Sequence, residues 1–243
     1  MTQIQTAPPS APDQSLPARI AGVIFTPRAT YAAVAAAPRI LGVLASVIAV
    51  CAFGVFLFLS TEVGQQAMID QQVRQMESFG SRMSDAQYAR MEQMAPYSRY
   101  FAVGGQIVSL PIAALVIAGI AFAVFNAFLG GDAAFKQVYA VVAHSGVIIA
   151  VQQMFSLPLA YARESLTGAT NLAVFFPFLD ENTFPARLLG AIDLFLVWWL
   201  ISLAIGFGVL YRRRTRPIAA AMLALYVAIG LVIAGIKTAL SGV

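Results

Sequence analysis

Charged side chains are scarce in this sequence. They make up 11% of the 243 residues, whereas hydrophobic residues make up 60%, and the mean hydropathy is +0.79. A soluble domain carries roughly 25% charged residues. A soluble globular domain is therefore excluded, because this chain could not cover its apolar residues with polar surface.

Histidine and cysteine are nearly absent, which removes most catalytic and metal-binding chemistry. The chain has one of each, His144 and Cys51. A histidine-based zinc site and a local Cys-His pair are therefore excluded, and Cys51 can form no disulfide within the chain. Phosphate-loop, Gly-Xaa-Ser-Xaa-Gly and His-Glu-Xaa-Xaa-His motifs do not occur in the sequence. We expect a protein without enzymatic activity, cofactor or metal.

Long apolar runs dominate what is present. A spanning helix needs roughly 20 apolar residues, and five stretches reach that length with at most one formal charge each. They cover residues 40–60, 101–129, 138–159, 188–211 and 217–236. The sequence thus predicts an all-α, polytopic membrane protein, a five-helix transmembrane bundle with short amphipathic surface helices.

The remaining segments are too short to build a second core, so we expect one membrane domain over residues 16–243. Residues 1–15 are rich in Pro, Gln and Ala and lack the basic start and apolar run of a signal peptide. We interpret them as a disordered tail. Thr26-Pro27 indicates a helix start. Residues 16–37 predict a short cationic helix on the inner leaflet, with a plain connector to the first span as the alternative.

The loop at residues 61–100 predicts two short amphipathic helices. Gly80 is placed to end the first, and Ser84 with Gln87 three residues later forms a capping-box pattern that begins the second, which Pro96 ends. We expect both helices to lie on the outer membrane surface or to cap the bundle.

Basic residues are distributed unequally between the two sides of the predicted membrane. The N-terminal region and the turns at 130–136 and 212–216 hold eight Lys or Arg and two acids, whereas the other side holds seven basic and eight acidic residues. Basic residues in short loops favour the cytoplasm, so we expect a cytoplasmic N-terminus and a C-terminus outside. Because these residues lie at membrane edges, we assign them no nucleic-acid binding. The densest group is the cytoplasmic basic turn Arg212, Arg213, Arg214 and Arg216.

One acidic residue interrupts the apolar stretches. Asp193 lies in the fourth predicted span, roughly 8 Å below its outer edge, and a charge within a span suggests a functional site. Gln106, Gln152 and Gln153 fall at similar depth in the second and third spans. The four side chains could form an outward-facing ion or ligand pocket. They could instead hydrogen-bond between helices and fix their packing, the interpretation that we favour.

The single histidine lies within the third predicted span. His144 is roughly 9 Å from Asp193 along the membrane axis, so we expect no direct pair between them. A packed hydrogen-bond partner and a proton relay are the two alternatives for His144, and we favour the first.

Small residues at helical spacing predict close helix packing, either within one chain, which we favour, or between two copies of the chain. They are Ser202 and Gly206 in the fourth span and Ala220, Ala224 and Ala228 in the last.

The turn between the second and third spans has a specific pattern. Gly130 and Gly131 allow a sharp exit from the second span. Asp132 is a plausible N-cap for the third span, and Lys136, after Phe135, is placed at the lipid headgroups.

The whole arrangement resembles bacterial members of the Yip-domain family, the Rab/Ypt-interacting type of five-span membrane protein. The similar segments are Thr26-Pro27-Arg28-Ala29-Thr30-Tyr31, Gly130-Gly131 followed by Phe135-Lys136, and Ile192-Asp193-Leu194-Phe195 with Trp198-Trp199 and Ile205-Gly206. The resemblance covers roughly residues 16–236.

The resemblance implies a non-enzymatic protein of the bacterial inner membrane that organises or shapes the membrane or scaffolds partners. Its partners would be the lipid bilayer and either other membrane proteins or a second copy of the chain. The acidic Asp-Leu-Tyr-Gly-Pro type segment of the eukaryotic trafficking members is absent, which argues against Rab-type GTPase binding. The alternative function is a small ion- or proton-coupled transporter or channel that uses a polar pocket near Asp193.

Overall fold

Helices make up almost the whole of the computed structural model, which describes residues 14–166, 168, 170–180 and 183–240. Residues 1–13 of the expected tail lie outside the described residues. No strand is assigned within the described residues, so the predicted all-α class is confirmed. The elements are α1 (Leu16–Phe25), α2 (Pro27–Ala36), α3 (Leu41–Leu59), α4 (Glu62–Ser78), α5 (Asp85–Met94), η1 (Ala95–Tyr97), α6 (Ser98–Phe122), η2 (Ala123–Phe128), α7 (Phe135–Ala162), η3 (Leu172–Phe175), α8 (Phe184–Gly190), α9 (Leu194–Leu210) and α10 (Thr215–Leu240).

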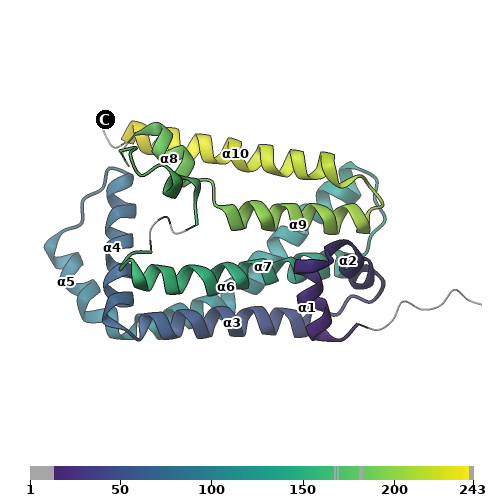
Figure 1. Ribbon diagram of the computed structural model, residues 1–243, viewed down its shortest axis with the longest axis horizontal. Coiled ribbons are helices and arrows are strands. Elements are labelled where there is room, and N and C mark those ends of the chain that lie inside the picture. The colour runs from purple at the N-terminus through teal and green to yellow at the C-terminus, as the bar shows by residue number, and fades with distance from the viewer. Residues whose placement is uncertain (1–13, 167, 169, 181–182, 241–243) are drawn as a thin grey trace, which may run out of the picture.

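The long helices lie side by side, with α7 at their centre. Helix α3 packs on α6 and α7, α7 also packs on α6 and α9, and α9 carries α10 on its other side. Figure 1 shows α1 and α2 at one end of these helices, with α4 and α5 at the opposite end. The turns that precede α7 and α10 lie at the α1–α2 end (Figure 1). The basic segments that we predict to be cytoplasmic therefore gather at one end of the bundle, which we call the basic end.

Four helical stretches in the described residues are long and apolar enough to cross a membrane. They are Leu41–Leu59, Asp85–Phe128, Phe135–Ala162 and Thr215–Leu240, and they contain four of the five predicted spans. Their exposed surfaces are rich in large apolar side chains, such as Ile120 on α6 and Leu225 on α10. This is the pattern of helices that face lipid rather than water.

The fourth predicted span differs from the prediction. Residues 188–211 do not form one helix, because α8 ends at Gly190 and α9 begins only at Leu194. Asp193 has an extended backbone and its side chain accepts hydrogen bonds from the backbone of α9. It is therefore the N-cap of a 17-residue helix and does not lie one and a half turns inside a continuous span. A short side chain with an acceptor oxygen competes for backbone N–H groups and favours a helix start at such a position.

The segment before the first span is more elaborate than the single surface helix that the sequence suggested. Helix α2 begins at Pro27 as predicted, but α1 precedes it and the two form a hairpin. The hairpin packs on α7 and α9, with Val23, Tyr31 and Val34 fully or almost fully buried. These apolar side chains therefore contact the bundle instead of the bilayer. Thr26 makes no side-chain cap.

The loop after the first span forms the two expected helices. Helix α4 ends at Ser78 and is followed by Gly80 with a φ of +76°, a left-handed conformation that suits glycine. The capping box of Ser84 and Gln87 is present at the start of α5, so that prediction is confirmed. After Met94 the chain passes through η1, which contains Pro96, directly into α6.

The two sets of small residues have different surroundings. Ser202 and Gly206 are buried, and a Cβ added at Gly206 would lie 2.5 Å from Val141 Cγ1. The prediction of close packing is correct for these two residues. Packing within the chain is wrong for the α10 set, because its members are exposed; these are Ala220, Ala224 and Ala228.

Candidate functional site

Asp193 is the centre of a polar cluster that joins three helices and a loop. Its Oδ1 accepts the backbone N–H groups of Phe195 at 2.8 Å and Leu196 at 3.0 Å. Its Oδ2 accepts from Gln152 Nε2 on α7 at 3.1 Å and from the Thr170 hydroxyl. Each of the two carboxylate oxygens thus accepts two hydrogen bonds, so groups of the protein itself stabilise the carboxylate of Asp193.

Two further contacts connect this cluster to α10 and to the preceding loop. The hydroxyl of Tyr226 accepts from Asp193 N at 2.9 Å and donates to Ala191 O at 2.8 Å. The loop residue Asn171 pairs with Asp193 as an isolated antiparallel bridge, through Leu172 N to Ile192 O and Leu194 N to Thr170 O. These bonds pair backbone N–H and C=O groups where the chain is not helical. Such groups cost free energy when they are left unpaired in an apolar environment.

Only part of the predicted four-residue cluster comes together. Gln152 contacts Asp193, but neither Gln106 nor Gln153 is among the hydrogen-bond partners of Asp193 in the described residues. Gln153 instead lines a groove of about 330 Å³ between α3 and α7, opposite Gly54 and beside Met154. Gln153 differs from Gln152 because consecutive residues on a helix point about 100° apart. Equal depth in the membrane does not place side chains on the same face.

Sequence reasoning missed Thr170 and Tyr226 as members of this cluster. Thr170 lies in a loop and Tyr226 lies 33 positions after Asp193, so no local spacing connects them. The available signal was the tyrosine hydroxyl within an apolar stretch, because such a hydroxyl needs a hydrogen-bond partner.

His144 is fully buried in α7 and does not contact Asp193. Its Nδ1 is 2.7 Å from the carbonyl oxygen of Ala140, and its Nε2 has no hydrogen-bond partner among the described residues. The neighbouring Ser145 donates to Val142 O and accepts from Trp199 Nε1 on α9 at 3.0 Å. These contacts are consistent with a histidine that packs between helices.

The hairpin of α1 and α2 carries buried polar groups that the sequence did not reveal. The Tyr31 hydroxyl lies 2.7 Å from Ser202 Oγ on α9. Burial raises the pKa of this hydroxyl and the bond to Ser202 opposes that effect only in part, so Tyr31 stays neutral. Arg19 is 2% exposed and donates to Gln14 O and Ala37 O, which ties the start of α1 to the end of α2.

The family-like turn before α7 is held by contacts to η2 and to Tyr211, the C-cap of α9. Gly130 has a φ of +66°, and a Cβ at Gly131 would lie 2.6 Å from Tyr211 Cε1. Tyr211 donates to Asn126 Oδ1, whose amide in turn donates to Ala133 O. The helix α7 is capped by Gln137, which accepts from Ala134 N.

Asp132 is not the N-cap of α7, because that position is occupied by Ala134. Phe135 packs edge-on against Phe122, and Lys136 is exposed.

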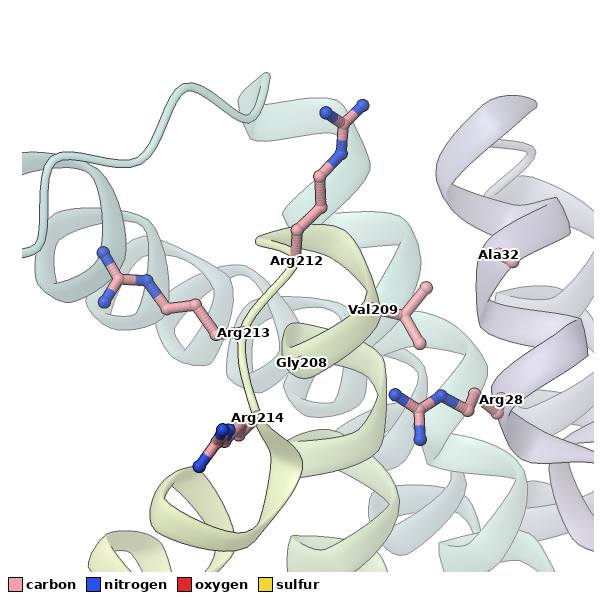
Figure 2. A pocket seen from close by; sticks show the side chains of 7 residues that line it. All are labelled: Arg28, Ala32, Gly208, Val209, Arg212, Arg213 and Arg214. Atoms are coloured by element: carbon pink, nitrogen blue, oxygen red, sulfur yellow. The ribbon is translucent and has the colours of Figure 1, made fainter.

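The basic turn forms a second candidate site. Arg212, Arg213 and Arg214 line a hollow of about 450 Å³ together with Arg28 of α2. Arg216 is exposed but does not line it. Figure 2 shows Arg28 extending from α2 towards the turn, while the three turn arginines fan out around Gly208. The charge count placed Arg28 on this side of the membrane but could not place it beside the turn.

Groups of side chains that could hold a metal ion are absent from the part of the chain that the structure describes. The long apolar helices and their apolar exposed surface define a multi-pass membrane protein. A family model, the Yip1 domain, matches residues 21–236. The chain therefore belongs to the Yip1-domain family. Comparison with curated proteins and with solved structures returned no match.

Proposed function

We propose that this protein is a non-enzymatic component of the bacterial inner membrane that organises or shapes the membrane or scaffolds partners through its basic end. The observation that supports this proposal most is the contrast between its charges. The charge of Asp193 is satisfied inside the protein, whereas Arg28 and the turn arginines are exposed.

The proposed orientation has a cytoplasmic N-terminus and an outside C-terminus. It rests on the excess of eight basic over two acidic residues and on the gathering of these segments at one end of the bundle (Figure 1). We expect a reporter at the C-terminus to be active only outside the cytoplasm. A reporter active only inside would contradict the orientation.

Proximity labelling from the cytoplasmic face tests the scaffold function. We expect neutralisation of the basic turn, with glutamine at Arg212, Arg213, Arg214 and Arg216, to remove partners from the labelled set. The matched control removes four charges at the opposite end, with glutamine at the exposed residues Arg74, Arg82, Arg90 and Arg163. An identical labelled set for both variants would contradict the proposal.

The alternative function is transport through the Asp193 region. It is supported by the convergence of polar groups from α7, α9 and α10, but four donors already occupy the two carboxylate oxygens. A scaffold should tolerate Asp193→Asn with its partner set unchanged, since asparagine is also a good N-cap. Loss of ion or proton flux in liposomes that contain this variant would support the transporter instead.

A further inference from the structure

The hollow at the basic end brings together segments that are far apart in the sequence. Arg28 and Ala32 of α2 form one wall, and Gly208 and Val209 of α9 with the following turn form the other. Its volume of about 450 Å³ lies within the usual range for small-molecule sites. Arg214, which also lines the hollow, directly precedes the first residue of α10, Thr215.

The arginines around the hollow are not neutralised. None of the four makes an ion pair within the described part of the chain, and Arg213 Nη2 donates a hydrogen bond to Leu129 O at 2.6 Å. Asp132, an acidic residue of the neighbouring turn, is exposed and makes no hydrogen bond or ion pair to them within the described residues. Like charges that line the same hollow repel one another, and an anion bound there would relieve the repulsion.

The backbone of the turn holds these side chains at the opening. Arg212 has a φ of +52°, the left-handed region that a non-glycine residue rarely adopts. Arg213 N donates to Gly208 O at 2.9 Å, which closes the turn on the end of α9. The side chains of Arg212, Arg213 and Arg214 extend from this tight turn in different directions (Figure 2). Arg28 faces the turn from α2, a helix that the buried side chain of Tyr31 fixes to the bundle.

The position of the hollow indicates which anion is available to bind there. It lies at the ends of α9 and α10, where a spanning helix leaves the hydrocarbon and enters the headgroup layer. Guanidinium groups match phosphate oxygens with paired hydrogen bonds. Anionic lipids are concentrated at a cytoplasmic surface and attract basic segments there.

We propose that Arg28 and the turn Arg212–Arg214 bind the phosphate of an anionic phospholipid headgroup. The headgroup lies in the hollow between α2 and the α9–α10 turn, and the acyl chains follow the apolar surface of the bundle. This inference rests on the proposed function because it names a partner for the same basic end. It makes that partner a lipid, whereas the scaffold proposal concerns proteins.

Native mass spectrometry of the full chain in a non-ionic detergent measures lipid binding directly. The lipid is phosphatidylglycerol, and phosphatidylcholine is the zwitterionic comparison. We expect the double variant Arg28→Gln/Arg214→Gln to bind phosphatidylglycerol about tenfold more weakly than the unchanged chain, because two charge-assisted contacts are lost. The matched double variant Arg82→Gln/Arg90→Gln, which removes the same charge at the opposite end, should change binding by less than about twofold.

Three results would overturn the proposal. Equal affinity for phosphatidylcholine would show that the headgroup charge is not recognised. An equal loss in the two double variants would show a general effect of net charge. Displacement of the lipid by inorganic phosphate at equal concentration would assign the site to a free anion. Thermal unfolding of both double variants checks that they fold, and these exposed arginines should leave the transition unchanged.

The lipid experiment and the labelling experiment fail independently. If lipid affinity does not depend on Arg28 and Arg214 but the labelled partners depend on the basic turn, only the lipid inference is wrong. If lipid affinity depends on them and the labelled partners do not, only the scaffold proposal is wrong.

Discussion

The charged residues at the two ends of the bundle differ in whether they have partners within the protein. At one end, Asp193 accepts hydrogen bonds from α7, from α9 and from the loop at Thr170, so its charge is used to hold the chain together. At the basic end, Arg28 and Arg214 make no ion pair within the described residues. The comparison shows two uses of a charged side chain near a membrane edge. A side chain that is hydrogen-bonded within the protein has a structural role, whereas a side chain without an ion-pair partner in the protein is available to bind a ligand.

The α1–α2 hairpin at the basic end has both buried and exposed polar side chains. Tyr31 and Arg19 are buried and fix the α1–α2 hairpin to the bundle. Arg28 lies on the same hairpin but is exposed. The hairpin therefore presents a cation from a packed support, which limits the entropy lost when an anion binds.

The largest effect should follow from removing the buried anchor of the hairpin. Tyr31→Ala deletes a fully buried ring and its bond to Ser202, and should lower the free energy of unfolding by about 3–5 kcal/mol. Reversible unfolding in mixed detergent micelles measures this loss. Tyr161→Ala, at a tyrosine that is 51% exposed, is the control and should change stability by less than about 0.5 kcal/mol. Equal effects would mean that the hairpin is not anchored by Tyr31.

The next effect concerns the close approach of α9 to its neighbours. An added methyl at Gly206 would lie 2.5 Å from Val141 Cγ1 and 3.2 Å from Tyr31 Cδ1. Gly206→Ala should therefore destabilise by about 1–3 kcal/mol, measured in the same unfolding assay. A Cβ at Gly119 of α6 meets no heavy atom of the described residues within 4 Å, so Gly119→Ala should be neutral or stabilising by up to about 1 kcal/mol. The same sign for both variants would contradict the packing of α9.

The role of Asp193 as a cap predicts a smaller loss at the opposite end. Asp193→Ala removes the acceptor for Phe195 N and Leu196 N and should cost about 1–2 kcal/mol. Asp193→Asn keeps an acceptor oxygen and should cost less. Unfolding of the two variants measures the difference. If asparagine were as damaging as alanine, the charge rather than the cap would be the important property.

The smallest effect compares two strained residues, one at each end. Arg212 after α9 and Glu164 after α7 have positive φ values of 52° and 50°. Glycine adopts this conformation without strain, so Arg212→Gly and Glu164→Gly should each stabilise by about 0.5–1 kcal/mol after the greater freedom of the unfolded glycine is subtracted. Only Arg212→Gly should also weaken phosphatidylglycerol binding in the mass-spectrometric assay. Weakening by both variants would remove the distinction between the ends.

Much of the fold was predictable because the bilayer imposes simple rules on sequence. Length and hydropathy located four spans, and the Ser84–Gln87 pattern located the start of α5. Both depend on residues that are close in the chain. The prediction of the fourth span as one continuous helix was wrong. Hydropathy does not detect the helix break at Asp193, because apolar residues surround this residue in the sequence.

The candidate sites were less predictable because they join distant residues. Gln152 was expected near Asp193, but Thr170 and Tyr226 were not, and Gln153 points into another groove. Depth along the membrane follows from residue number, whereas the face of a helix that meets its neighbour follows from how all the helices pack. The exposed alanines of α10 illustrate the same limit, because a small-residue ladder does not say what covers it.

The sequence by itself determined that this protein lies in a membrane, the number of its apolar stretches and the unequal distribution of its basic residues between the loops. Composition and local length control those properties through the free energy of transfer into lipid. Only the tertiary structure decided that Tyr31 anchors a hairpin, that Asp193 starts a helix, and that Arg28 stands opposite a turn more than 180 positions away. Those outcomes depend on side-chain packing between distant segments, which no local pattern encodes.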